Sequence, residues 1–216
     1  MNTAINSIPV TSKWETTGGH SPMVALFNSI HPISKEAIEY LDLKSYPLKV
    51  NKGKFLLKAN QANNQLFLIT KGVVRGFMVE ENKEITTWIN EENEIVGSIR
   101  SLGLPWAVSE ENIQVIETAH LIGIEYSCIE YMYSNFPESN IIARIILENS
   151  YRDAEERAFI CRIPSAEKKY LRFMKTKPDL INRISLKYIA SFLGITQETL
   201  SRIRTRESKN KDQPKH

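Results

Sequence analysis

The pattern of apolar and polar residues divides the chain into a helical start, a β-rich middle and a helical C-terminal part. From Met23 to Leu43 the apolar residues recur at helical spacing. Between Tyr46 and Ile124 short β-rich runs alternate with Gly, Asn and acidic turns, which favours a compact antiparallel sandwich or barrel. The predicted strands are Tyr46–Val50, Phe55–Leu57, Leu66–Thr70, Val73–Val79, Ile85–Ile89, Ile113–Ile116 and His120–Ile124. We expect Gly72 to form the bend between two of the central strands.

After Ser127 the helical period returns, with a short helix at 129–133 and a long one from Pro137 to about Ile160. The apolar residues of the long helix form two stripes. One stripe holds Ile141, Ile142, Ile145, Ile146 and Phe159, and the other holds Leu147, Tyr151, Ala154, Ala158 and Cys161. A helix with one partner needs only one stripe. We therefore predict that this helix packs on its own β-domain and against a second copy; burial between two domains of one chain is the alternative.

The run Ile184–Arg204 predicts two short helices joined by a tight turn. Ser185 and Thr196 are good N-caps, and Gly194 can take the left-handed conformation that ends a helix. The first helix carries an apolar face of Leu186, Ile189, Ala190 and Leu193, spaced i, i+3, i+4 and i+7. This is how a helix-turn-helix presents its recognition helix to the major groove.

The second of these helices carries a polar outer face. Its outward residues are Gln197, Glu198, Ser201, Arg202 and Thr205. Arg pairs bidentately with guanine, Glu accepts from the cytosine amine, and Gln can pair with adenine. We predict that DNA is bound by Thr196, Gln197, Glu198, Ser201, Arg202 and Arg204. The competing interpretation is an ordinary amphipathic helical hairpin with a solvated outer face.

The distribution of charge favours the DNA interpretation. Residues 162–216 hold 14 Lys or Arg and 5 Asp or Glu, a net charge of +9. Residues 1–161 hold 14 basic and 20 acidic residues, a net charge of −6, so the overall value of +3 conceals a strong asymmetry. A basic C-terminal quarter concentrates positive potential where a phosphate backbone would lie.

Composition narrows the class of protein further. A chain of 216 residues with 42% hydrophobic and 25% charged residues is typical of a folded protein with one large or two smaller domains. There is no apolar run of roughly 20 residues that would span a membrane, and no signal peptide is expected, so we predict a cytoplasmic location. Cys128 and Cys161 lack the clustering of a metal or iron–sulfur site, and we expect both to be buried, inert thiols rather than redox sensors.

The order of these elements resembles the cyclic-AMP receptor protein and fumarate–nitrate regulator (Crp/Fnr) family of transcription factors, over residues 23–206. The stretch 66–75, Leu-Phe-Leu-Ile-Thr-Lys-Gly-Val-Val-Arg, looks like that family's central roll strands and their Gly turn. The stretch 196–203, Thr-Gln-Glu-Thr-Leu-Ser-Arg-Ile, looks like its recognition helix. The resemblance implies a homodimer on a two-fold symmetric operator, with Glu198 and Arg202 contacting a C·G and a G·C pair in each half-site. The best-known member has Arg where this chain has Gln197, so one base of that preference does not carry over from the resemblance.

The resemblance also predicts five parts and an α+β fold class. These are a poorly ordered N-terminus at 1–22, an antiparallel β-roll at 23–136, a long dimerisation helix and hinge at 137–163, a helix-turn-helix domain of winged-helix type at 164–206 and a basic tail at 207–216. Because little sequence follows the recognition helix, any strand wing must come from before the helix-turn-helix.

The cyclic-nucleotide cassette of that family is degenerate here. Members that bind the nucleotide carry a Gly-Glu pair and, about ten residues later, an Arg that pairs with the phosphate. The corresponding Gly97 is followed by Ser98, no Arg lies between residues 102 and 115, and Arg100 comes too early. We therefore expect no cyclic-AMP binding. For another effector the candidate pocket residues are Trp88, Gly97, Ser98 and Arg100, with Trp106 nearby, although tryptophans in such a roll are usually core residues.

These observations predict a sequence-specific DNA-binding regulator that acts as a homodimer, with RNA polymerase as a further candidate partner. The alternative is a small-molecule sensor whose C-terminal domain mainly contacts protein. A cupin-like enzyme would need clustered histidines, yet His20, His31, His120 and His216 are scattered. Because no nucleophile triad or Gly-rich phosphate loop is present either, we expect no enzyme activity, no metal and no cofactor.

Overall fold

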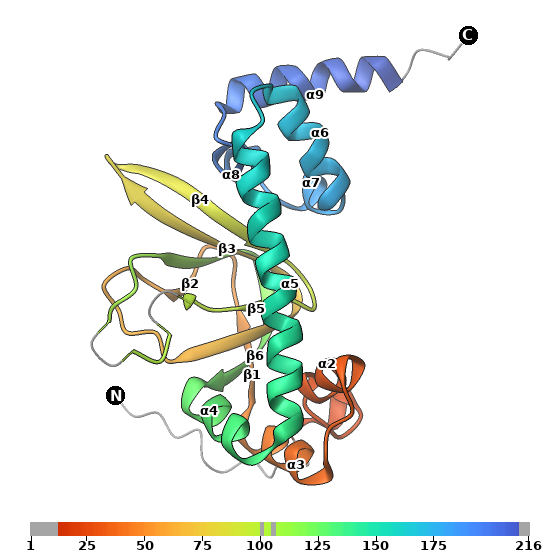
Figure 1. The fold of residues 1–216 in the computed structure, drawn as a ribbon. Coiled ribbons are helices and arrows are strands. Elements are labelled where there is room, and N and C mark those ends of the chain that lie inside the picture. The colour runs from red at the N-terminus through yellow and green to blue at the C-terminus, as the bar shows by residue number, and fades with distance from the viewer. Residues whose placement is uncertain (1–12, 100–101, 105–106, 212–216) are drawn as a thin grey trace. The chain divides into compact units, whose positions relative to one another are not determined.

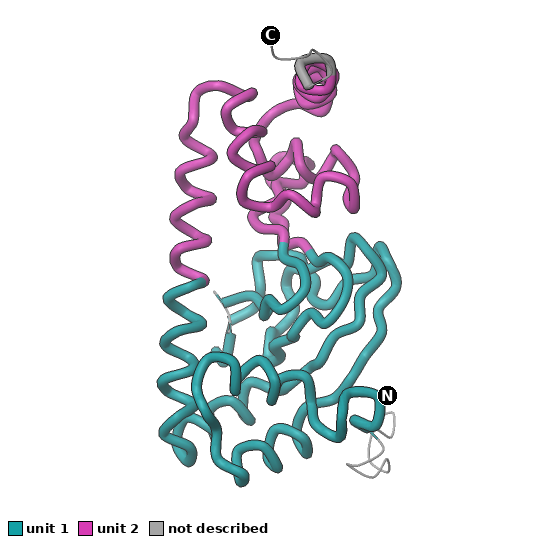
Figure 2. Tube along the Cα trace, turned by 90° about the vertical axis from the view of Figure 1, so that its right-hand side faces the viewer, with its two compact units in different colours: residues 1–74, 90–149 teal, residues 75–89, 150–216 magenta. Residues whose placement is uncertain are grey.

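The computed structural model describes residues 13–99, 102–104 and 107–211. The chain divides into two compact units, one made of residues 1–74 and 90–149 and the other of residues 75–89 and 150–216 (Figure 2). The boundaries fall inside two strands and one long helix, so these elements contribute residues to both units.

The β-rich middle of the chain forms one sheet of six strands (Figure 1). The strands are β1 (Tyr46–Val50), β2 (Phe55–Leu57), β3 (Gln65–Glu80), β4 (Lys83–Asn90), β5 (Ile95–Val96) and β6 (Asn112–Glu125). The main order is β1-β6-β3-β4, with β2 paired to β6 and β5 paired to β3. β1 runs antiparallel to β6, with Tyr46 opposite Gly123 and Val50 opposite Ala119. The predicted antiparallel β-sheet followed by helices is thus confirmed.

Two pairs of predicted strands are in fact single long strands. The predicted bend at Gly72 lies inside β3, and β6 joins the two runs that were expected to be separate. Gly72 has a φ of +101°, and an added Cβ would lie 2.6 Å from the backbone oxygen of Thr118 and 2.7 Å from Cα of Ala119. Its glycine is therefore required by the close approach of β6 rather than by a chain reversal.

Helices close one end of the first unit. They are a 3₁₀ turn η1 (Glu15–Thr17), α2 (Pro22–Ile30), α3 (Lys35–Lys44), α4 (Tyr126–Asn135) and the first half of α5 (Pro137–Arg162). Ser21 and Ser34 cap α2 and α3 with their side-chain oxygens, as expected for residues of this type at N-caps. The predicted long helix agrees with α5 within two residues at its C-terminal end.

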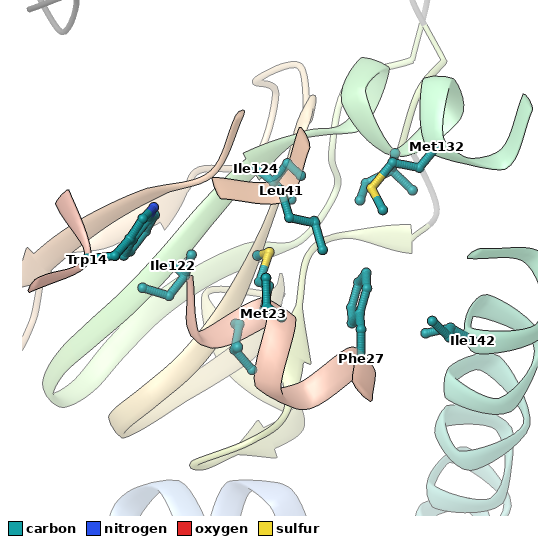
Figure 3. Packing of buried hydrophobic residues seen from close by; sticks show 11 residues of the cluster. Trp14, Met23, Phe27, Leu41, Ile122, Ile124, Met132 and Ile142 are labelled. Carbon is teal, nitrogen blue, oxygen red and sulfur yellow. The ribbon is translucent and has the colours of Figure 1, made fainter. Parts of the chain in front are cut away.

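The core of this unit lies between these helices and the sheet (Figure 3). Its members are Trp14, Met23, Val24, Phe27, Leu41, Leu68, Ile122, Ile124, Ile129, Met132 and Ile142. The Trp14 ring is 1% exposed, and its indole N–H donates to the backbone oxygen of Asp42 over 3.0 Å. The expectation of a poorly ordered N-terminus up to residue 22 is therefore wrong for residues 13–22, while residues 1–12 lie outside the described part.

The second unit contains residues 75–89 and the helices that follow α5. These helices are α6 (Ala166–Thr176), α7 (Leu180–Arg183), α8 (Leu186–Leu193) and α9 (Gln197–Lys211). Between α6 and α8 the chain forms α7. The described residues 164–211 contain helices and no strand, so the wing named in the predicted fold class is not seen in them.

Candidate nucleic-acid interface

α8 and α9 are separated by the turn that the sequence predicts. Ser185 accepts a hydrogen bond from the backbone N–H of Lys187 over 3.3 Å at the start of α8. Gly194 ends α8 with a φ of +63°, in the left-handed region that glycine tolerates. Thr196 then accepts a hydrogen bond from the backbone N–H of Thr199 over 3.1 Å, which is N-cap geometry. Local hydrogen bonds therefore define the beginnings of α8 and α9, and the left-handed Gly194 defines the end of α8.

The inner faces of the two helices form a small apolar core with α6. The buried residues on α8 and α9 are Ile189, Ala190, Leu193, Leu200 and Ile203, and α6 contributes Tyr170 and Phe173. The rings of Phe173 and Phe192 are 5.5 Å apart between centroids. Lys169 of α6 donates to the backbone oxygen of Leu193 over 3.0 Å, which satisfies a carbonyl at the C-terminus of α8.

The outward face of α9 agrees with most of the predicted DNA-binding residues. The exposed ones are Thr196, Gln197, Glu198, Ser201 and Arg202. Glu198 and Arg202 lie one helical turn apart on the same face. Within the described residues, neither side chain forms an ion pair or a hydrogen bond with another group. Both are therefore available to a ligand that approaches this face.

Arg204 lies elsewhere on α9. It is half-buried, follows the buried Leu200 by four residues and acts electrostatically on Tyr170 of α6. Burial raises the pKa of Tyr170, and the positive charge of Arg204 opposes that rise. Arg204 is thus placed at the flank of the buried face, apart from the other predicted residues.

One basic residue near this face is absent from the predicted set. Lys187 stands in the first turn of α8, and its side chain is 61% exposed. The first helix of a helix-turn-helix crosses the DNA backbone, so a cation here is suited to a phosphate. Its place two residues after the cap Ser185, in the first turn of the helix, was the signal in the sequence. Arg206, farther along α9, lies 3.8 Å from Glu167 in an exposed and therefore weak ion pair.

The candidate effector residues fall in different parts of the chain. Ser98 is buried, its hydroxyl lies 3.1 Å from that of Ser109, and its backbone oxygen accepts from Asn63 over 2.9 Å. An added Cβ on Gly97 would lie 2.5 Å from a methyl carbon of Leu66, so the backbone is tightly packed there. Gly97 and Ser98 are consecutive in the chain, so their proximity does not by itself assemble a pocket.

The structure says less about the remaining effector candidates, Trp88, Arg100 and Trp106. Trp88 is half-buried in β4 and belongs to the second unit, whereas Gly97 and Ser98 belong to the first. Arg100 and Trp106 lie outside the described residues. Among the described residues, no group of three or more His, Cys, Asp or Glu side chains is arranged to hold a metal ion.

The expectation of two buried thiols is wrong. Cys161 is exposed near the C-terminus of α5, and Cys128 is half-buried in α4. Cys128 contacts Tyr40, whose pKa is raised to about 12, chiefly by burial and then by the hydrogen bond with this thiol. A residue on an apolar stripe is buried within the chain only where another part of the same chain packs on that stripe. The stripe that carries Cys161 is largely exposed, so Cys161 is exposed with it.

Comparison with known proteins places this fold. No family model matches the chain, and no curated protein sequence matches it. Solved structures do match. A protein from Eubacterium rectale, described as a transcriptional regulator of the Crp/Fnr family, shares 15% identity at a TM-score of 0.65, covering 85% of this chain and 87% of that one.

Two further structures are similar over comparable lengths. FixK2 from Bradyrhizobium japonicum shares 14% identity at a TM-score of 0.65, covering 77% of this chain and 85% of that chain. The c-di-GMP responsive global regulator CLP from Xanthomonas campestris shares 14% identity at a TM-score of 0.63. The match covers 85% of this chain and 96% of that chain. The chain therefore has the fold of the Crp/Fnr transcriptional regulators, with a β-roll like that of a solved cyclic-nucleotide-binding domain and a C-terminal helix-turn-helix. None of the helices in the described residues is long and apolar enough to cross a membrane.

Proposed function

We propose that this protein is a sequence-specific DNA-binding transcriptional regulator that acts as a homodimer. The observation that carries the proposal is the outer face of α9, where Glu198 and Arg202 are exposed, unpaired among the described residues and one turn apart. The turn at Gly194 and the apolar core beneath α8 and α9 hold this face rigidly, which base recognition requires. The fold of transcriptional regulators supports the same function.

The chemistry of the face defines the bases that it would recognise. The guanidinium of Arg202 matches the O6 and N7 acceptors of guanine, and the carboxylate of Glu198 accepts from the N4 amine of cytosine. Gln197 and Ser201 flank them on the same exposed face. Thr196, Lys187 and Arg204 are then candidates for phosphate contacts, which add affinity without sequence preference.

The proposal of a homodimer rests on the outer stripe of α5. Leu147 is 58% exposed and Tyr151 is 66% exposed, and Ala158 and Cys161, farther along the stripe, are exposed as well. Exposed apolar side chains at i, i+4, i+11 and i+14 of one helix are suited to a second copy of that helix. A two-fold dimer would also offer two recognition helices to a symmetric operator.

We further propose that the effector is absent or is not cyclic AMP. Ser98 stands where nucleotide-binding members carry Glu, and its hydroxyl and carbonyl already bond to Ser109 and Asn63. No Arg occurs between residues 102 and 115 to neutralise a cyclic phosphate. A cytoplasmic location, contact with RNA polymerase and the absence of enzyme activity belong to the same proposal.

The test uses the 216-residue protein and DNA selected from a random pool by repeated rounds of binding. The selected half-site should contain a C·G and a G·C pair. Arg202→Lys keeps the charge and loses the bidentate geometry, so it should retain random-sequence affinity but lose selectivity for the G·C pair by roughly 10-fold or more. Glu198→Ala should lose selectivity at the C·G pair alone.

The matched control is Lys49→Ala, which removes an exposed charge from β1 in the first unit. It should leave both affinity and selectivity unchanged. Retention of full selectivity by Arg202→Lys would contradict the assignment of α9 as the recognition helix. Absence of duplex binding by the wild type, even at low salt, would contradict the function itself and favour a sensor whose C-terminal domain contacts protein.

A further inference from the structure

The free edge of a strand is covered by the first helix of the helix-turn-helix. β4 is the last strand in the order β1-β6-β3-β4, so one of its edges pairs with no other strand of the described residues. The hydroxyl of Ser191 on α8 accepts from the backbone N–H of Thr86 and donates to the backbone oxygen of Glu84, both over 2.9 Å. One side chain thus satisfies two successive groups of that edge, as a neighbouring strand would. We refer to residues 75–89, the parts of β3 and β4 in this unit and their turn, as the arm.

A buried cation lies beneath this contact. The Arg75 side chain is only 2% exposed, and its guanidinium carbon lies 4.0 Å from the ring centre of Phe77 and 4.1 Å from that of Tyr188 on α8. Its guanidinium donates to Glu84 over 2.7 Å and to the hydroxyl of Thr86 over 3.3 Å. A buried guanidinium is stable only when it is paired and stacked in this way, and α8 supplies one of the two rings.

Glu84 joins this cluster to a cation of the candidate DNA interface. Its carboxylate lies 2.7 Å from Arg75 and 3.6 Å from the ammonium of Lys187. Burial alone would raise the pKa of Glu84, but the hydrogen bond and charge of Arg75, together with Lys187, hold it below its usual value. Glu84 is therefore an anion at neutral pH. Two more carboxylates, Glu80 and Glu81, lie exposed at the turn of the arm.

We propose that the arm is an intramolecular latch on α8 that competes with the DNA backbone for the first helix of the helix-turn-helix. This rests on the proposed DNA-binding function. Lys187 cannot pair fully with Glu84 and with a phosphate at once, and a phosphate next to α8 would be repelled by the carboxylates of the arm. Release of the arm frees Lys187 from Glu84 and Ser191 from the strand edge, and raises affinity for DNA. Because β3 and β4 continue from the arm into the β-roll, a change in the roll has a covalent route to the latch.

The test compares two changes of equal charge on the arm. Glu84→Gln removes the anion that bonds Arg75 and Lys187, whereas Glu80→Gln removes an exposed anion four residues away. Ser191→Ala is a second latch variant that breaks both edge hydrogen bonds without any change in charge. Fluorescence anisotropy measures affinity for a random-sequence duplex at one fixed ionic strength, and hydrogen–deuterium exchange measures protection of the amides at 84–89.

Glu84→Gln should bind the duplex roughly 10-fold more tightly than Glu80→Gln, the scale of one charge-assisted hydrogen bond. Glu84→Gln and Ser191→Ala should both speed exchange at 84–89, and Glu80→Gln should not. Equal affinities of the two charge variants, or weaker binding by Glu84→Gln, would overturn the latch. If no protein, the wild type included, binds the duplex, then the proposed function has failed, and the exchange data alone decide whether the arm is held on α8.

Discussion

Glu156 near the end of α5 and Arg172 in α6 form a two-point ion pair, with Nε to Oε1 at 2.5 Å and the second pair of atoms at 2.7 Å. The two residues lie on either side of the bend at Pro164 and Ser165, where one helix ends and the next begins. The parallel hydrogen bonds restrict direction as well as distance. The pair therefore fixes the angle at which the chain enters the helix-turn-helix domain.

This pair predicts a dependence of stability on pH. The hydrogen bond and charge of Arg172 lower the pKa of Glu156 below 4.5, its value when unperturbed. A lowered folded-state pKa stabilises the protein above the unfolded value, and the contribution is lost as the pH falls through the folded-state pKa. Glu156→Gln should therefore lower the melting temperature at pH 7, and this effect should shrink as the pH falls below 4.5 and through the folded-state pKa, as thermal unfolding over that pH range would show. Glu39→Gln, which breaks a long and exposed pair with Lys35, should leave the melting temperature unchanged over the same pH range. Equal shifts in melting temperature for both variants would contradict this account.

The left-handed residue between α8 and α9 predicts a graded series of stabilities. An added Cβ on Gly194 would meet only Lys169 Nζ, at 3.9 Å, so the cost of substitution comes from the backbone alone. Gly194→Ala should destabilise the fold by about 1–2 kcal/mol in urea unfolding. Gly194→Asn should cost less, because Asn tolerates the left-handed region better. If Asn and Ala were equally costly, the φ of this residue would not be what limits substitution.

Gly72 predicts a larger effect with a different origin. Its substitution would press a methyl group against backbone atoms of β6 at 2.6 and 2.7 Å, and backbone cannot give way as a side chain does. Gly72→Ala should therefore cost about 3 kcal/mol or more in the same urea experiment. Gly53 has a similar positive φ of +86° but no atom within 4 Å of an added Cβ. Gly53→Ala therefore measures the cost of the positive φ alone. It should lower the free energy of unfolding clearly less than Gly72→Ala does.

The outer stripe of α5 predicts the oligomeric state. The 216-residue chain should sediment at about twice its mass of 24.8 kDa. Leu147→Glu with Tyr151→Glu should shift the protein to a monomer, because carboxylates would be buried against each other at the seam. Asn149→Glu introduces one such carboxylate about 200° around the helix from Leu147 and should leave the dimer intact. A wild type that sediments as a monomer at micromolar concentration would remove the case for this seam.

Local features of the sequence predicted the helix-turn-helix well. The caps at Ser185 and Thr196 and the turn at Gly194 act over three or four residues, so short-range rules suffice for them. The face of α9 followed from the helical period. Arg204 does not lie on this face, because it follows the buried Leu200 by four residues and so lies above the same side of the helix. The helical period of the sequence could have revealed this position.

Contacts that are distant in the sequence were not predictable in the same way. The burial of Trp14 was not predicted. Its indole bonds to Asp42, which is 28 residues away, and a pattern of neighbouring residues does not report such a contact. Gly72 looked like a turn because glycine serves both turns and close approaches, and only its proximity to Thr118 distinguishes the two. The contact of Ser191 with the edge of β4 spans 105 residues, and no pattern along the chain reports it.

The exposed stripe of α5 has a consequence for control. Under our proposal only the dimer offers two recognition helices, and below the dimerisation constant the amount of dimer grows with the square of the total protein. Occupancy of an operator would then rise more steeply than the supply of the chain itself. A modest change in the rate of synthesis or degradation would act as the signal, without any small molecule.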